Sequence, residues 1–337
     1  MFGRRKQQAG NPRKAIAEFW IWWRDAQQPI ADAIGRGNVS DLAGDISQRV
    51  HAIDPDLEWE LTPGHKSKHG FVLTPAGSAK LRATVARWLA EAPAPTETWQ
   101  FYGSRQPDAS VLTATLQING HEVDLARLRF GARIDEDHAF VEVRVHHPVF
   151  GKLDDETRWR VSFMSLDWVL GEERVAAWVG PVEPAIAEPP GAVEGLALAA
   201  LVDTLVDKHR EPIWVLLQGQ RKNTPITATA QRPLRPVRWP RFDTHVEVQL
   251  RYADRGNGFP TDASLEQLRA IEDELTQLLG RDGDLLAHET GGGVRSLHFY
   301  VDGSAAVAAP LRARAGELGA KSTESYDPDL EHVRHLS

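Results

Sequence analysis

Several clusters of polar residues in this sequence have side chains suited to catalysis or metal binding, but their spacing favours structural roles. His146 and His147 are adjacent, so on a strand their rings point to opposite faces and cannot share a metal ion. Gly291-Gly292-Gly293 lies between two predicted strands rather than before a helix, so it is not a phosphate-binding loop. Asp154-Asp155-Glu156 stands at a predicted helix start, where acids complement the helix dipole.

No other pattern in the sequence points to a reaction. No spacing of His, Asp or Glu is typical of a zinc site, no serine stands in a nucleophile-elbow pattern, and cysteine is absent. We therefore predict no catalytic residue, no metal and no cofactor, and we expect a protein that acts by binding. An enzyme without a recognisable signature is the alternative.

The sequence predicts a cytoplasmic protein with no membrane segment. No run approaches the 18 apolar residues of a membrane span, and the lack of cysteine is typical of a reducing compartment. The basic cluster Arg4-Arg5-Lys6 is followed by polar residues instead of the apolar core of an export signal. We interpret residues 1–10 as a disordered tail.

Charge and tryptophan content divide the chain into two regions. Residues 241–337 contain 10 Lys and Arg against 17 Asp and Glu, a balance of −7, whereas residues 1–240 contain 29 against 30. All 11 tryptophans lie at or before Trp239. We therefore predict an α+β protein of two domains, a Trp-rich α+β domain over 11–190 and an acidic domain over 241–337, joined by residues 191–240.

The N-terminal domain begins with an aromatic helix in which Ile16, Phe19, Trp20 and Trp23 recur at helical spacing. Trp20 and Trp23 share the buried face, and Trp22 points elsewhere. The pattern favours packing of Trp22 on a neighbouring element. The alternative is an exposed anchor for a protein partner, because tryptophan is favoured at binding hot spots.

The connecting region 191–240 predicts a helix and a strand that lead into a basic stretch over 218–242. This stretch contains no acid, and its basic residues are Arg221, Lys222, Arg232, Arg235, Arg238 and Arg241. We interpret it as a solvated connector that neutralises the acidic domain. Phosphate binding is the alternative.

The C-terminal domain has the strand and helix order β-α-β-β-α-β, which is typical of a ferredoxin-like two-layer sandwich. An apolar stripe is predicted on the first helix, at Leu265, Leu268, Ile271, Leu275 and Leu278. Three acids of this helix lie off the stripe and are predicted to be exposed and to bind a protein: Glu266, Asp273 and Glu274. The sheet face away from the helices is predicted to be free and to gather His245, Glu247, Gln249, Arg251, Ser296, His298 and Tyr300.

Short motifs in this domain give it a family resemblance that covers about 95 residues. They are Gly258-Phe259-Pro260, a helix with Glu272, the run Thr290…Arg295…Tyr300 and the closing Asp327-Pro328. These motifs resemble the regulator of ribonuclease E activity B (RraB) family. They are also similar to the C-terminal part of a bacterial family catalogued as domain of unknown function 695 (DUF695). The resemblance implies a protein that binds a ribonuclease and inhibits it without being an enzyme.

The leading hypothesis is a regulatory or adaptor protein that binds a ribonuclease or another basic protein. His298 and Tyr300 on the free face are further candidates for contact with the partner. An immunity-type protein that neutralises a toxin is one alternative, because acidic domains suit basic nucleases. An RNA-binding module is a weaker one, because the free face offers only one aromatic residue and two histidines in an acidic domain.

Overall fold

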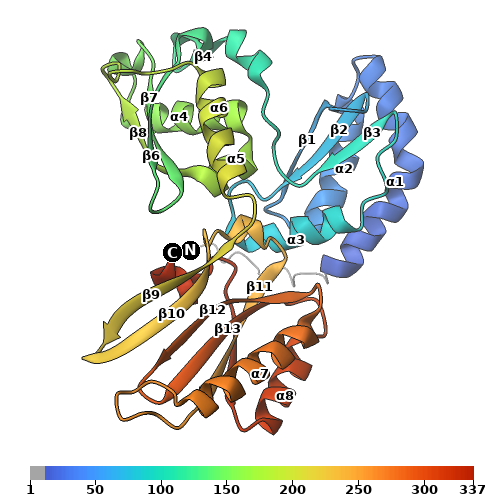
Figure 1. Ribbon diagram of the computed structural model, residues 1–337. Helices are drawn as coiled ribbons and strands as arrows, with labels where there is room; N and C mark the ends of the chain where they lie inside the picture. The colour runs from blue at the N-terminus through green and yellow to red at the C-terminus, as the bar shows by residue number, and fades with distance from the viewer. Residues whose placement is uncertain (1–11) are drawn as a thin grey trace, which may run out of the picture. The chain divides into compact units, whose positions relative to one another are not determined.

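The computed structural model describes residues 12–337, and the tail predicted over 1–10 lies outside this range. The chain is a mixed α+β protein, as predicted, and it forms two compact units. The N-terminal unit contains the described residues up to Ala126 together with Asp154–Ala176. The C-terminal unit contains Arg127–Leu153 and Ala177–Ser337. Figure 1 labels the helices and strands of both units.

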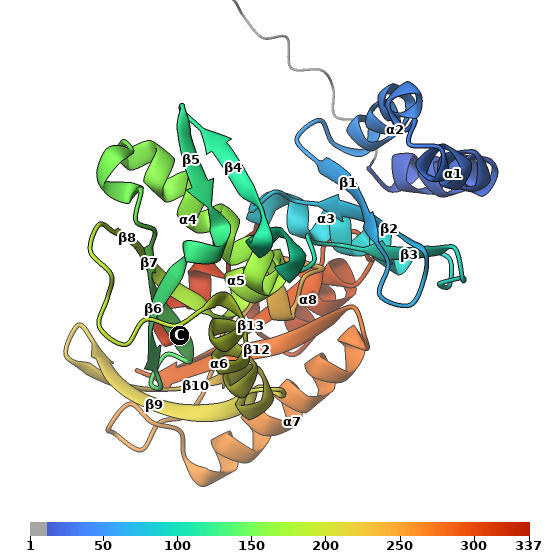
Figure 2. The ribbon, with the colours of Figure 1, turned by 90° about the horizontal axis from the view of Figure 1, so that it is seen from above.

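The N-terminal unit combines helices with a three-stranded sheet and a separate hairpin. Its elements are α1 (Pro12–Gly35), α2 (Ser40–Ile53), β1 (Glu58–Pro63), β2 (His69–Thr74), α3 (Ala79–Ala90), β3 (Trp99–Tyr102), β4 (Thr115–Ile118), β5 (His121–Asp124) and α4 (Asp155–Leu170). The short helix α5 (Glu172–Trp178) crosses from this unit to the next. The sheet order is β1-β2-β3, with β2 and β3 parallel, and β4 and β5 form the hairpin visible in Figure 2.

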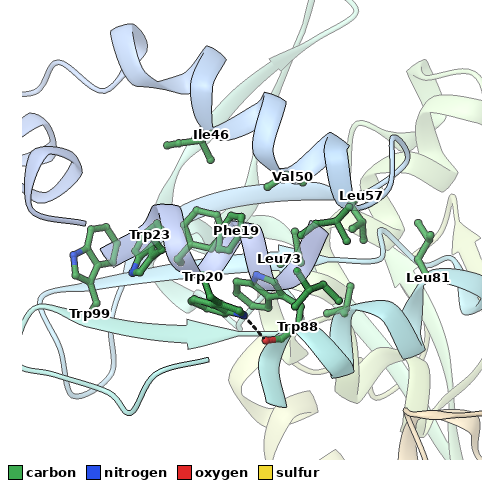
Figure 3. Close-up of a cluster of buried hydrophobic side chains, with 14 of the residues drawn as sticks. Phe19, Trp20, Trp23, Ile46, Val50, Leu57, Leu73, Leu81, Trp88 and Trp99 are labelled. Carbon is green, nitrogen blue, oxygen red and sulfur yellow. Dashed lines mark hydrogen bonds between the residues drawn. The ribbon is translucent and has the colours of Figure 1, made fainter. Parts of the chain in front are cut away.

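An aromatic cluster forms the core of the N-terminal unit (Figure 3). Phe19, Trp20 and Trp23 of α1 are buried as predicted, and they meet Trp88 of α3 and Trp99 of β3. The Trp20 and Trp88 rings stack with their centroids 4.7 Å apart. The indole N–H of Trp20 donates a 3.0 Å hydrogen bond to the backbone carbonyl of Trp88. Helical spacing therefore places the large rings of α1 on one face, where they fill the core.

Trp22 packs on the neighbouring helix, as the favoured interpretation predicted. Its ring is half-buried against the aromatic core, and the Arg49 guanidinium of α2 lies 5.7 Å from the ring centroid. Trp22 is therefore not the exposed side chain that the alternative, an anchor for a protein partner, required. Pro29 lies inside α1, which is one continuous helix that runs to Gly35.

The C-terminal unit contains a small sheet and a large one. Its elements are β6 (Arg129–Asp135), β7 (Phe140–His146), β8 (Val179–Ala185), α6 (Gly195–Lys208), β9 (Ile213–Arg221), β10 (Thr224–Arg232), β11 (Phe242–Arg251), α7 (Asp262–Leu279), β12 (Gly283–Gly291), β13 (Val294–Asp302), α8 (Ala308–Glu317), β14 (Lys321–Tyr326) and the 3₁₀ helix η5 (Glu331–Leu336). The small sheet has the order β6-β7-β8, and the large one has the order β14-β11-β13-β12-β10-β9.

The large sheet is antiparallel throughout, and α7 and α8 cover one face of it (Figure 1). The first and third strands of the acidic domain, β11 and β13, are neighbours. Strands β9 and β10 extend this sheet beyond β12. Part of the region predicted as a connector, 191–240, is therefore sheet.

The apolar stripe of α7 differs from the predicted one at its end. Leu268 and Leu275 are buried as predicted, whereas Leu278 is 48% exposed and Leu279 takes the buried position. Three helical turns of 3.6 residues from Leu268 end at Leu279 rather than at Leu278. Thr261 is its N-cap, and the Thr261 hydroxyl accepts a hydrogen bond from the Ser264 N–H.

Candidate functional site

The face of the large sheet opposite α7 and α8 carries the predicted site residues His298 and Tyr300, but it is not free. Tyr300 is fully buried, and His245 and His298 are nearly so. The cover is the C-terminal η5, whose Val333 and Leu336 pack with Leu330 against this face. This corrects the predicted open face, although Gln249 and Arg251 at the far end of β11 are exposed.

A buried pair between Tyr300 and Asp327 holds the covering segment in place. The Tyr300 hydroxyl donates a 2.6 Å hydrogen bond to Asp327 Oδ2. Asp327 also accepts from the backbone N–H groups of Glu331 and His332, at 2.9 and 3.1 Å. Burial and this hydrogen bond raise the pKa of Tyr300. Burial alone would raise the pKa of Asp327, but its three donors lower it instead. At neutral pH Tyr300 is therefore protonated and Asp327 is charged.

Three histidine rings stack across this face. His245 of β11 lies between His298 of β13 and His332 of η5, with ring centroids 5.3 and 4.3 Å away. His245 Nε2 and His298 Nδ1 are 3.0 Å apart, which is hydrogen-bonding distance. Burial and the two neighbouring imidazoles lower the pKa of His245 to about 3. His245 is therefore neutral at pH 7.

Glu289 of β12 forms a second polar centre beside the histidines. Its carboxylate accepts hydrogen bonds from Arg221 at 2.8 and 3.0 Å. Glu289 also lies 3.1 Å from His335 Nε2 and 3.4 Å from His298 Nε2. Burial opposes ionisation, but the nearby His298 and the hydrogen bonds from His335 and Arg221 keep the pKa of Glu289 well below its ordinary value. The carboxylate is charged and ties β9, β12 and η5 together.

The remaining motif residues form a separate polar link under α7. Arg295 Nε donates to the Thr290 hydroxyl at 2.9 Å, and Arg295 Nη1 lies 3.3 Å from Glu272 Oε2. The same carboxylate oxygen is 3.1 Å from His288 Nδ1. The motifs Glu272, Thr290 and Arg295 therefore join α7 to the sheet on the face opposite Tyr300.

The three predicted acids of α7 do not form one group. Glu266 and Asp273 are exposed as predicted. Glu274 is only half-exposed, because it forms an ion pair with Arg314 of α8. The prediction placed the acids correctly off the apolar stripe but did not foresee the neighbouring helix.

The basic residues of the stretch 218–242 mostly bind other parts of the C-terminal unit. Arg235 donates to the backbone carbonyls of Ala177 and His138, and Arg238 donates to those of His209 and Arg210. Arg221 and Arg241 pair with acids, and Arg232 donates to a backbone carbonyl. Arg221 and Arg241 therefore offset acidic charge as predicted, but the other three arginines are only partly exposed and bind the backbone, unlike the predicted solvated connector.

The N-terminal unit holds an acidic pocket that no sequence pattern predicted. It has a volume of about 510 Å³, and Glu60, Arg105, Asp167 and Trp168 are among its lining residues. Burial, with the nearby Glu172 carboxylate, raises the pKa of Asp167 to about 6. These residues are far apart in the sequence, so no local spacing could have brought them together. Asp167 is able to exchange a proton near neutral pH.

Within residues 12–337, no three His, Asp or Glu side chains are arranged to hold a metal ion. No helix in the same range is long and apolar enough to cross a membrane. Residues 223–329 match a family described as Family of unknown function (DUF695), so this part of the chain is a DUF695 domain. No curated protein and no solved structure matches the chain. The match begins after β9 and ends before η5.

Proposed function

We propose that this protein is a non-enzymatic cytoplasmic regulator that binds another protein through its DUF695 domain. The observation that carries the proposal is that the motif residues form buried polar contacts within the domain and no catalytic arrangement. Tyr300, Asp327, Glu272 and Arg295 are joined in pairs, with Tyr300, Asp327 and Arg295 buried and Glu272 mostly so. Residues used in this way fix a rigid domain, and a rigid domain presents its outer surfaces to a partner at low entropic cost.

We also propose that β11 to β14 with α7 and α8 are a ferredoxin-like unit of the RraB type. The element order β-α-β-β-α-β and the strand order β14-β11-β13-β12 support this assignment. The hairpin of β9 and β10 is then an addition at one edge of the sheet. The motifs that suggested the RraB family all lie within this unit.

The proposed partner is a basic protein, with a ribonuclease as the leading candidate. Residues 241–337 carry 17 acids against 10 Lys and Arg, and Glu266 and Asp273 are exposed on the outer side of α7. Opposite charge of this kind mainly raises the association rate and is screened by salt. An immunity-type protein would use the same surface, and the identity of the captured protein separates the two functions.

Capture from the native host with the full chain as bait tests this proposal. The bait variant Glu266→Lys/Asp273→Lys should recover less partner, and 0.5 M salt should weaken capture by the wild type, because the Debye length falls to about 4 Å. The control Glu91→Lys/Glu97→Lys makes the same charge change at exposed positions of the N-terminal unit. Equal recovery by both variants would reject the electrostatic surface of α7.

RNA binding through the sheet face receives no support from the site. That hypothesis needs Tyr300 as a stacking platform for a base, but Tyr300 lies beneath η5 and donates to Asp327. A fluorescent single-stranded RNA that bound the wild type and the Tyr300→Phe variant, and lost binding on Tyr300→Leu substitution, would support it.

A further inference from the structure

The strand β9 is an edge of the large sheet with exposed apolar side chains. It pairs with β10 on one side, and Figures 1 and 2 show it as the outermost strand. Ile213, Trp214 and Leu216 are 60%, 49% and 63% exposed. The strand is nine residues long. Long apolar edges invite pairing with another strand, so native proteins usually protect them.

The opposite edge of the same sheet is protected. Strand β14 has six residues, carries Lys321 and Glu324, and is followed by Pro328. Between Ile213 and Gln220, β9 has no charged residue and no proline, and its pairing with β10 has no bulge. The features that protect β14 from pairing with another strand are therefore missing from β9.

The hairpin turn fixes which backbone groups of β9 face outward. Arg221 pairs with Thr224 across the two-residue loop Lys222-Asn223, whose φ angles are both positive, as a type I′ turn requires. Such a loop makes the flanking residues a hydrogen-bonded pair, so Arg221 and every second residue before it bond to β10. The N–H and C=O groups of Trp214, Leu216, Gln218 and Gln220 therefore point away from β10.

We propose that β9 pairs antiparallel with β9 of a second copy of this chain, centred on Val215. This register places Trp214 opposite Leu216 of the second copy, and Ile213 opposite Leu217. Trp214 and Leu216 then exchange backbone hydrogen bonds, while Val215 faces Val215 as a non-hydrogen-bonded pair. The result is one continuous sheet across the dimer.

The sequence of β9 favours a second copy over an unrelated strand. In this register every exposed apolar side chain meets an apolar one, and no charged residue lies within 213–217. A two-fold interface requires such self-complementarity. The proposed pairing uses β9 alone and no residue of α7, so this inference goes beyond the proposed regulatory binding and stands without it.

Cysteine substitution tests the register cleanly, because the chain has no cysteine of its own. A non-hydrogen-bonded pair has a Cα–Cα distance of about 4.5 Å, within the range of about 4.4–6.8 Å for disulfides. The full-length Val215→Cys variant should form a covalent dimer under mild oxidation. Thr323→Cys, at an exposed position of β14, is the matched control and should form no covalent dimer, although its intact β9 still pairs.

Sedimentation of the full-length protein over a concentration series completes the test. The wild type should dimerise, and Leu216→Glu should raise the dimer dissociation constant at least about tenfold by placing carboxylates beside the two-fold axis. Glu266→Lys/Asp273→Lys should dimerise like the wild type, which separates this inference from the proposed function. A wild type that stays monomeric at every concentration would overturn the proposal. So would a disulfide at Thr323→Cys but not at Val215→Cys.

Discussion

The aromatic core of the N-terminal unit and the second face of the large sheet are both buried, but they are held together differently. In the first, Phe19, Trp20 and Trp23 pack mainly by ring contact, and the indole N–H groups of Trp20 and Trp99 donate to backbone carbonyls. In the second, Tyr300 and Asp327 are fixed by directed hydrogen bonds. The stabilisation from ring packing is proportional to the buried area and does not depend on pH. The stabilisation from a buried polar network depends on each donor being present and on the protonation state of each group.

The largest effect should follow from a cavity in the aromatic core. Trp23→Ala removes one of the largest fully buried side chains and should lower the free energy of unfolding by about 3–5 kcal/mol. Urea denaturation followed by tryptophan fluorescence measures it, since eight of the 11 tryptophans belong to the N-terminal unit (20, 22, 23, 59, 88, 99, 159 and 168).

The matched control for this prediction keeps an aromatic ring. The Trp23 indole N–H has no hydrogen-bond partner among the described residues, so Trp23→Phe should cost much less than Trp23→Ala. Equal losses for the two variants would mean that ring packing does not dominate this core.

The polar face should instead respond to acid. Unfolded His245 takes up a proton near its ordinary pKa of about 6.5, whereas the folded pKa is about 3. The unfolded state binds the proton first, so this stability is present above pH 6.5 and is lost as the pH falls. Between pH 6.5 and 4 the loss should be about 3 kcal/mol. Glu289, whose folded pKa is lowered, adds a further loss only below its ordinary range.

Hydrogen exchange of β13 peptides across this pH range measures the effect. His245→Asn should flatten the pH dependence, even if it lowers stability at neutral pH. The same substitution at the exposed His51 of α2 should leave the dependence unchanged. A wild type whose β13 protection does not change from pH 6.5 to 4 would contradict the buried neutral imidazole.

A smaller effect should follow from loss of the Tyr300 hydroxyl. Tyr300→Phe leaves the Asp327 carboxylate buried without one of its donors and should cost about 2 kcal/mol. Because Asp327 also holds η5, exchange should rise in β13 and η5 together. A double-mutant cycle with Asp327→Asn should give less than the sum of the single losses, and strict additivity would show that the two groups do not act as a pair.

The sequence predicted the first of these regions better than the second. Apolar spacing was enough to place Ile16, Phe19, Trp20 and Trp23 in a core, because one helix face collects them. The same reasoning set Glu266 and Asp273 outside, because they lie off the apolar stripe of their helix. The strand pattern also put His245, His298 and Tyr300 on one face.

The alternating pattern of the strands did not predict that η5 covers this face. The segment η5 packs on that face, and the hairpin of β9 and β10 lengthens the sheet at its edge. The three-residue spacing of Leu330, Val333 and Leu336 could have predicted this segment, because a 3₁₀ helix aligns every third side chain on one side. Both β9 and η5 lie outside residues 223–329, which match DUF695, so the motifs of this domain did not predict them.

The smallest effects separate two ion pairs on the same helix. Glu272 pairs with the buried Arg295, whereas Glu274 pairs with Arg314 at a surface where both side chains are about 40% exposed. Glu272→Gln should lower the free energy of unfolding by about 1 kcal/mol, because the amide still accepts from Arg295 but no longer offsets its buried charge. Glu274→Gln should leave the urea midpoint unchanged, since water and salt screen an exposed pair. If Glu274→Gln proved the more costly change, burial would not decide the strength of polar contacts here, and the contrast between the aromatic and polar regions would lose its physical basis.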